Sequence, residues 1–259
     1  MSKTTRRGFL LAGAGAAVVA GGWAVWSRGQ GGEGSPGDLG GGQKCRTPES
    51  LTSFDQVGGG RLGYEVSGNT TTMQSDPRFL ELLQAWATDW AALSGLGAIR
   101  EVWSYGAYTD KCNSFHQSGR AFDIARIVHA DGKVSCRFDD WGPGSAAQLR
   151  AYWRLAASLQ MHFSYTLTHL YNGQHDNHIH VDNAVNGYER PAFKTRSRVQ
   201  AQLIQATLRH VHGQAVEVTG VWDDQTKAAL KQVQQRLGIT RPLADVDGFH
   251  AYLRATAAG

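Results

Sequence analysis

Two stretches of the chain carry apolar residues at the spacing of an amphipathic helix. The first follows Asp76-Pro77 and stops at Gly95, because proline suits the first helical turn and glycine is typical of a helix end. Its apolar positions are Phe79, Leu82, Leu83, Trp86, Trp90 and Leu93. The second runs from about Ser145 to Met161, and its inward positions are Leu149, Trp153, Ala156 and Leu159. We therefore predict two helices whose aromatic side chains lie in the core.

Short apolar segments between these helices predict strands. The clearest are residues 99–104 and 179–181. A few helices mixed with short, scattered strands are typical of an α+β fold rather than of a regular βαβ repeat.

After Pro191 the pattern changes to three short helices, expected at about 199–210, 223–237 and 248–255. The middle one has a single apolar stripe and stops at Gly238. A chain of 259 residues has room for a core plus a smaller module. We therefore expect two folded units, one at 45–190 and a three-helix unit at 195–257.

The first 26 residues have the layout of an export signal. A basic start with Arg6 and Arg7 precedes an uncharged run from Gly8 to Trp26. Arg6-Arg7-Gly8-Phe9-Leu10-Leu11 resembles the twin-arginine signal, which directs the export of folded proteins. An uncleaved membrane anchor is the alternative. The glycine-rich residues 27–44 predict a flexible linker.

Export permits disulfide bonds among the three cysteines, Cys45, Cys112 and Cys136. Cys112 and Cys136 bracket the segment that is richest in candidate chemistry, so we predict that these two pair. Pairing of Cys45 with either of them is the alternative.

Charge narrows the choice of partners only slightly. The net charge of +4 and the pI near 9.0 suit an anionic environment, such as nucleic acid, membrane headgroups or an acidic wall polymer. An ordinary soluble basic protein would have the same values. A nucleic-acid binder would rest on the pI alone, and the export signal argues against it.

Three histidines, His175, His178 and His180, lie within six residues of one another. Side chains on a strand alternate between faces, so His178 and His180 would point to one side while Ile179 and Val181 point to the other. Such a pair places two nitrogen donors over one spot.

His116 and Asp123 add donors from an earlier segment, and Gly119 between them would let the chain turn. A catalytic zinc site takes three protein ligands and keeps one position for water. Surface histidines or a weak adventitious metal site are the alternatives, but the two segments together favour a metal centre.

The spacing of these residues resembles that of a known family. His116, Gly119, Ala121 and Asp123 match H-x-x-G-x-A-x-D, and His178-Ile179-His180 matches a later H-x-H. This is the signature of the LAS-type zinc peptidases, which include D-alanyl-D-alanine carboxypeptidases, dipeptidases and murein endopeptidases. Residues 116–141 are also similar to the bacterial extensin-like C-terminal domain of that superfamily.

The resemblance implies a small antiparallel-sheet zinc peptidase domain within residues 45–190. It implies that His116, Asp123 and His180 hold zinc and that His178 acts as general base, with His175 assisting.

The sequence departs from the family pattern in two places. Carboxypeptidase and dipeptidase relatives have a glutamate three residues before a zinc histidine, whereas this chain has Asn177 before His180 and His175 before His178. Asp176 is an alternative base. The Ser-Gly-Tyr-Arg run that often supplies a transition-state arginine is missing, and Arg120 or Lys111 would have to provide that support.

Residues 219–230 resemble the G-x-[FW]-x-x-x-T-x-x-A-[LV] core of the three-helix peptidoglycan-binding domain. A helical appendage without a ligand is the alternative.

The sequence thus predicts an exported zinc-dependent hydrolase that cuts stem or cross-bridge peptides of peptidoglycan, as a D,D-carboxypeptidase or an endopeptidase. Its partner would be peptidoglycan in the cell wall or outside the cell, with membrane contact only through an uncleaved N-terminal segment. The competing prediction is a non-catalytic peptidoglycan-binding protein with a structural zinc site.

Overall fold

The computed structural model describes residues 50–110, 114–142, 144–183 and 187–259. The predicted export signal, the glycine-rich linker, Cys45, Lys111 and Cys112 lie outside these ranges. Within the described ranges, no helix has the length and apolar character needed to cross a membrane.

Strands and helices alternate irregularly up to residue 182. The strands are β1 Thr52–Phe54, β2 Gln56–Val57, β3 Gly60–Tyr64, β4 Asn69–Thr70, β5 Met73–Ser75, β6 Ile99–Gly106, β7 Ala121–His129, β8 Lys133–Ser135, β9 Tyr165–Leu167 and β10 Ile179–Asp182. The helices are α1 Pro77–Ser94, α2 Phe138–Trp141, α3 Ala146–Gln160, α4 Arg198–His210, α5 Asp224–Arg236 and α6 Val246–Ala258. Two 3-10 turns, η2 Phe115–Ser118 and η3 Gly173–His175, complete the set.

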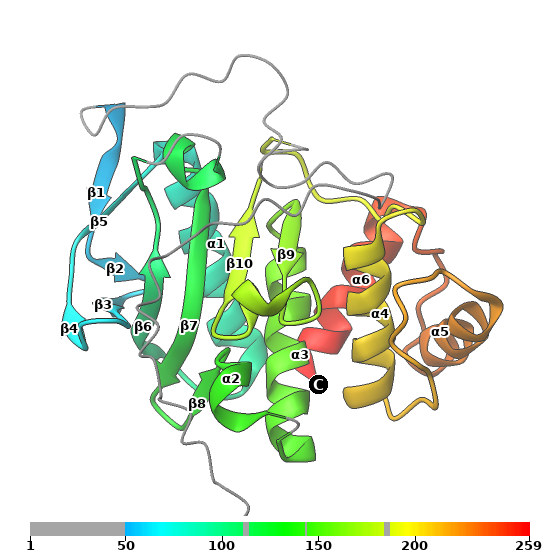
Figure 1. The fold of residues 1–259 in the computed structure, drawn as a ribbon. Helices are drawn as coiled ribbons and strands as arrows, with labels where there is room; N and C mark the ends of the chain where they lie inside the picture. The colour runs from blue at the N-terminus through cyan, green and yellow to red at the C-terminus, as the bar shows by residue number, and fades with distance from the viewer. Residues whose placement is uncertain (1–49, 111–113, 143, 184–186) are drawn as a thin grey trace, which may run out of the picture. The chain divides into compact units, whose positions relative to one another are not determined.

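Most strands join one sheet with the order β2-β3-β6-β7-β10-β9 (Figure 1). β4 extends it beside β3, β8 extends it beside β7, and β1 pairs with β5 separately. The pairs are antiparallel except for β3 with β6, which run parallel. The prediction of a mixed α+β fold is confirmed at this level.

The central strand β7 was not among the predicted strands. Its nine residues are buried at six positions and half-buried at three, without strict alternation. It pairs with β6 along one edge and with β10 and β8 along the other, and its burial pattern shows that both of its faces are largely covered. A strand in that position gives only a weak alternating signal.

Helix α1 begins and ends where the sequence predicts. The Asp76 carboxylate accepts hydrogen bonds from the backbone N–H groups of Arg78 and Phe79, and Gly95 takes a left-handed conformation with φ 72°. A side-chain cap of this kind is worth about 1 kcal/mol. The buried face carries Phe79, Leu83, Trp86, Ala87 and Trp90, each at most 1% exposed, so the prediction that the aromatic side chains lie in the core is confirmed; the predicted Leu82 and Leu93 are half-buried.

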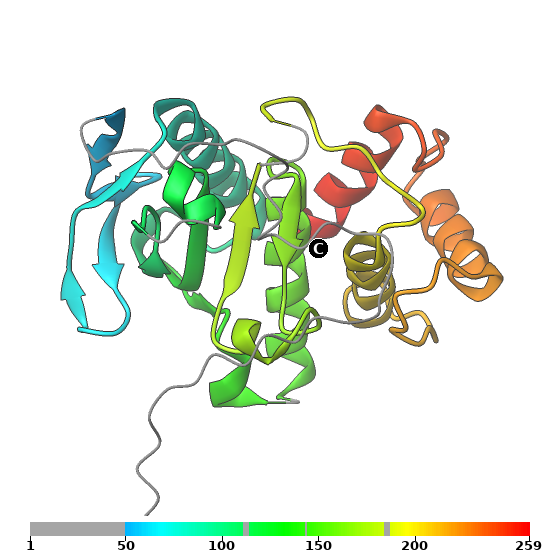
Figure 2. The same cartoon turned by 45° about the horizontal axis from the view of Figure 1, so that its top comes forward.

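Helix α3 is enclosed on all sides near its C-terminal end. Ser145 and Gln148 form a capping box at its start. Every residue from Leu155 to Gln160 is buried, which is more than one full turn. The helix packs against α1, α4 and α6 and against β8 and β9 (Figure 2).

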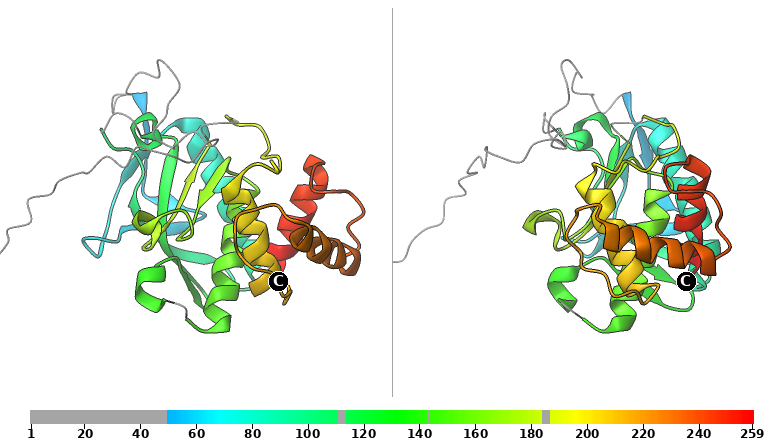
Figure 3. Two further views of the ribbon diagram at one scale, coloured as in Figure 1. Left: turned by 45° about the vertical axis from the view of Figure 1, so that its right-hand side comes forward. Right: turned by 90° about the vertical axis from the view of Figure 1, so that its right-hand side faces the viewer.

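The three C-terminal helices α4, α5 and α6 lie where their periodicity predicts. α5 crosses α4 on the outside (Figure 3). Residues from this segment, such as Leu203 and Leu253, share one hydrophobic core with residues from α1 and α3. All described residues belong to one compact unit, and the division into two folded units at 45–190 and 195–257 stays a prediction.

Arg154 on α3 joins the ends of two other helices. Its Nη2 donates to the carbonyls of Leu93 (3.2 Å), Ser94 (3.0 Å) and Ala258 (2.9 Å), and its Nε donates to that of Ala257 (3.0 Å). The last carbonyls of a helix have no partner within the helix. One guanidinium therefore caps the C-terminal ends of α1 and α6 together.

Candidate metal centre

Strand pairing brings the first two predicted ligands together. In the register of β10 with β7, His180 lies directly opposite Asp123. Ile179 and Val181 are fully buried in the core, as the alternation of the H-x-H segment predicts, and so are Phe122 and Ile124 on β7. Asp123 and His180 therefore point to the opposite face, where His180 Nδ1 lies 2.8 Å from Asp123 Oδ1.

The third ligand, His116, reaches the same spot from the 3-10 turn η2. The Ser114 side chain caps this turn, and Gly119 ends it with φ 67°. A Cβ at Gly119 would lie only 2.6 Å from the backbone nitrogen of Asp76, so the turn requires glycine for space as well as for conformation. His116 Nε2 lies 3.2 Å from Asp123 Oδ2.

The structure thus groups His116, Asp123 and His180, with their donor atoms all within 4.8 Å of one another. We call these three residues the triad. It is a possible metal-binding set, and it is the set that the sequence predicts.

The remaining ring nitrogens of the two histidines are already engaged. His116 Nδ1 hydrogen-bonds the carbonyl oxygen of Ala107. His180 Nε2 lies 3.0 Å from a carboxylate oxygen of the fully buried Asp182. A carbonyl or an ionised carboxylate can only accept, so each of these nitrogens carries the proton. His116 Nε2 and His180 Nδ1 face Asp123 at 3.2 Å and 2.8 Å, and these are the nitrogens that would give up a proton to ligate a metal ion.

The charges at the triad support one another. Burial raises the pKa of Asp123, but the charges and hydrogen bonds of His116 and His180 outweigh burial and hold this pKa well below its usual value. Burial lowers the pKa of His180, but hydrogen bonds to Asp123 and Asp182 raise it to about 10. Both pKa shifts have the same cause: the Asp123 carboxylate is negatively charged and favours positive charge on the groups around it.

Two further histidines lie next to the triad. His178 Nε2 is 3.5 Å from Asp123 Oδ1, and His178 Nδ1 hydrogen-bonds the Asn177 side-chain oxygen at 2.6 Å. The ring of His175 lies 5.0 Å from that of His178 and 5.9 Å from that of His180.

Both neighbours have lowered basicity. Burial lowers the pKa of His178. Burial, reinforced by the charges of His180 and His178, lowers the pKa of His175 to about 3. The structure therefore brings His175 and His178 together with the predicted ligands and favours their neutral forms.

Arg120, the predicted transition-state support, is engaged elsewhere. Its Nε donates to the Asn183 side-chain oxygen at 2.9 Å and its Nη2 to the Asn183 carbonyl at 3.0 Å. Its guanidinium also lies 5.3 Å from the centre of the Tyr188 ring. The catalytic role of Arg120 stays a prediction.

The predicted disulfide between Cys112 and Cys136 stays a prediction, because Cys112 lies outside the described residues; among the described residues Cys136 is a free thiol. Its side chain is fully buried in the core, and burial raises its pKa far above the usual value. A thiol in that position behaves as a small apolar side chain.

Sequence reasoning missed the residues that orient the ligands. Asp182 had a signal, because it stands two positions after His180 and so shares its face of the strand. Ala107, Asn172 and Asn177 had none, since a backbone carbonyl and common loop amides become partners only through the fold. The Asn172 side-chain oxygen accepts a hydrogen bond from His175 Nδ1 at 2.7 Å.

Tyr105 on β6 was also missed. Its ring lies 5.9 Å from that of His178. Burial raises its pKa, and the nearby Arg137 guanidinium partly offsets that effect. Arg137 and Arg126 each lie 3.4 Å from a carboxylate oxygen of the buried Glu65. A row of aromatic and charged side chains, Tyr105, Arg137, Glu65 and Arg126, therefore lies beside His178.

Comparison with known proteins gives one match. Residues 96–192, which contain the triad and both neighbouring histidines, match the family described as extensin-like protein C-terminus. No curated protein and no solved structure matches the chain.

Proposed function

We propose that this chain is an exported zinc-dependent hydrolase of the LAS type that cuts stem or cross-bridge peptides of peptidoglycan. The observation that carries the proposal is the triad with its outer hydrogen bonds already in place, flanked by His178 and His175. Such a donor set, two nitrogens and one carboxylate, suits zinc in an open site.

His116, Asp123 and His180 would hold the ion through Nε2, a carboxylate oxygen and Nδ1. A zinc ion bound there would supply a nucleophile near neutral pH and a Lewis acid for the scissile carbonyl. The Ala107 carbonyl and the Asp182 carboxylate would keep both histidine rings in the ligating orientation.

His178 is the side chain best placed to move a proton. Its Nδ1 is occupied by the Asn177 oxygen, so Nε2 on the triad side is the atom that would accept and return the proton. Asn177 itself cannot take the role of the glutamate found in carboxypeptidase relatives, because an amide does not titrate. Asp176, the alternative base, shows no comparable contact with the triad among the described residues.

Two observations support the wall as substrate. The C-terminal helices carry the sequence pattern that resembles peptidoglycan-binding domains, and the N-terminal residues resemble an export signal. A module that binds the wall would raise the concentration of substrate at the triad.

The test is hydrolysis of purified peptidoglycan by the zinc-loaded protein and by its His180→Ala and His178→Ala variants. His212→Gln, a histidine substitution in the helical segment, is the matched control. We expect the wild type and the control to release new peptide termini, and we expect none from His180→Ala or His178→Ala. Mass spectrometry of the fragments then distinguishes a carboxypeptidase from an endopeptidase. A folded, zinc-loaded protein that sediments with peptidoglycan and yields no new termini would instead establish a binding protein.

A further inference from the structure

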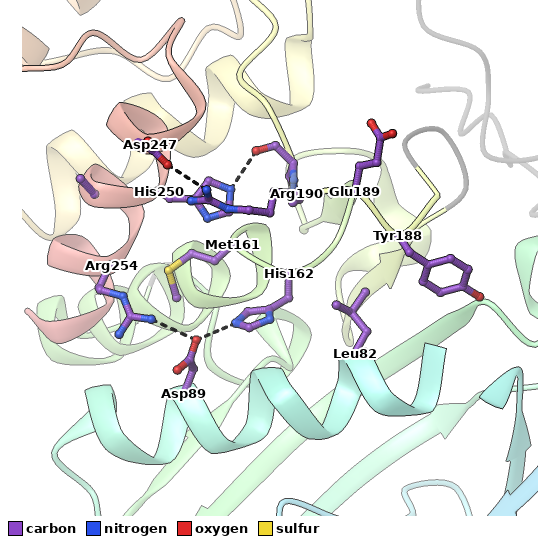
Figure 4. A pocket seen from close by; sticks show the side chains of 12 residues that line it. Leu82, Asp89, Met161, His162, Tyr188, Glu189, Arg190, Asp247, His250 and Arg254 are labelled. Carbon is purple, nitrogen blue, oxygen red and sulfur yellow. Dashed lines mark hydrogen bonds and ion pairs between the residues drawn. The ribbon is translucent and has the colours of Figure 1, made fainter. Parts of the chain in front are cut away.

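A pocket lies away from the triad, between α1, the end of α3, residues 188–191 and α6 (Figure 4). Its volume is about 460 Å³, which is within the range of small-molecule sites. None of the triad residues lines it, and neither do His175 and His178.

Hydrogen bonds hold the walls of this pocket in place. On one side, the Asp89 carboxylate accepts from His162 Nε2 at 3.0 Å and from Arg254 Nη2 at 3.1 Å. These bonds connect α1 with α6 and with His162, two residues after the end of α3 (Figure 4).

The opposite side is fixed in the same way. Arg190 Nη1 donates to Asp247 at 2.8 Å, and His250 Nε2 donates to the Pro191 carbonyl at 2.9 Å. Because both sides are fixed, the cavity is preformed and a ligand would not have to order it.

The two arginines of the pocket have donors to spare. A guanidinium carries five N–H donors. Among the described residues, Arg254 and Arg190 each use one nitrogen for a hydrogen bond, and their side chains are 55% and 58% exposed. Both can therefore bind a carboxylate of a ligand without giving up their present partners.

The pocket carries charges of both signs. Two guanidinium groups and three carboxylates, those of Asp89, Asp247 and Glu189, line it. Glu189 is exposed and has no hydrogen bond or ion pair with any described residue, so it is free to bind a cation. His162 and His250 add no charge near neutral pH, because burial lowers the pKa of each. A mixed wall of this kind favours a ligand that carries both charges over a polyanion or a polycation.

We propose that this pocket binds a short peptide with a free carboxylate and a free ammonium group, the chemistry of a peptidoglycan stem peptide. The carboxylate contacts Arg190 and Arg254, the ammonium contacts Glu189, and the aliphatic parts lie on Leu82 and Met161. The choice of a wall peptide rests on the proposed function, whereas the pocket itself is separate from the triad.

The test is calorimetric titration of the metal-free full chain with the tripeptide L-Ala-γ-D-Glu-diaminopimelate. Arg190→Gln and Glu189→Gln are expected to weaken binding about tenfold, and acetylation of the peptide's amines is expected to do the same. Arg61→Gln is the matched control, because Arg61 is also exposed and ion-paired to a carboxylate but lies outside this pocket. The control should bind as the wild type does.

Absence of binding by the wild type, or unchanged affinity in both pocket variants, would overturn the proposal. Equal affinity for trialanine would overturn the assignment to a wall peptide. Because the titration uses metal-free protein, a failure of hydrolysis at the triad does not affect it. Conversely, hydrolysis of peptidoglycan without peptide binding in this pocket would overturn the proposed pocket ligand and leave the proposed hydrolase function standing.

Discussion

The hydrogen bond between Asp182 and His180 is expected to control metal affinity. The Asp182 side chain is fully buried, and its carboxylate oxygen lies 3.0 Å from His180 Nε2. Replacing it with asparagine keeps an acceptor of the same shape but removes the charge, which roughly halves the strength of such a bond. Replacing it with alanine leaves a buried N–H without a partner, at a cost of about 1–3 kcal/mol.

Outer partners of metal-bound histidines typically account for about 10–100-fold in affinity. We therefore expect Asp182→Asn to weaken zinc binding about tenfold and Asp182→Ala about a hundredfold, or roughly 1.4 and 2.7 kcal/mol. The assay is competition between the metal-free protein and a chromogenic chelator for zinc. Circular dichroism of each metal-free variant establishes that the fold is retained.

Asp89→Asn is the matched control, because Asp89 forms a bond of the same length, 3.0 Å, with the Nε2 of another histidine, His162, outside the triad. It should bind zinc as the wild type does. If folded Asp182→Ala binds zinc within twofold of the wild type, or if Asp89→Asn weakens binding equally, then the outer carboxylate does not orient His180.

Three further outcomes are expected. His178→Ala should lower the rate of peptide hydrolysis by about 10²–10⁴-fold, measured by release of new amino termini, while zinc affinity stays within about threefold, because His178 moves a proton and is not a ligand. Burial, with a smaller effect from the charge of His210, lowers the pKa of His169 from 6.5 to about 4. Between these pH values the unfolded chain binds more protons than the folded chain, so the free energy of unfolding falls as the pH drops from about 6.5 to 4. Urea unfolding at pH 4.5 should find His169→Phe more stable than the wild type by about 1–2 kcal/mol after allowance for solvent screening, with little difference at pH 7.5; equal stability at both pH values would contradict this. Arg154→Ala should lower the free energy of unfolding by about 2–4 kcal/mol, since several helix-end carbonyls lose their donor; a loss below about 0.5 kcal/mol would show that water replaces it.

The helices and the triad could be predicted from the sequence because their signals are local. Six-residue and longer runs with helical spacing define α1 and α3, and caps such as Asp76 and Ser145 mark their starts. The histidines and Asp123 stand at fixed spacing within two short segments. Each of these signals lies within a short segment, although the fold is needed to bring the two segments of the triad together.

What sequence reasoning missed depends on contacts between distant segments. β7 gives little alternation because residues on both of its faces are buried. Arg120 and Asp123 are near in sequence, yet Arg120 bonds Asn183, 63 positions away. The burial of Cys136 in the core likewise depends on the packing of distant segments. Contacts of this kind cannot be read from one segment of the chain alone.

The enclosure of α3 has a consequence for proteins of the matched family. The match ends at residue 192, before α4 begins, yet α4 and α6 both pack on α3. A protein of that family that stops near that point would leave facing water the side of α3 that α4 and α6 cover here. Such a protein would need polar residues on that side or a second subunit to cover it. The composition of this one helix should therefore tell, from sequence alone, which proteins of the family carry a C-terminal helical segment and which do not.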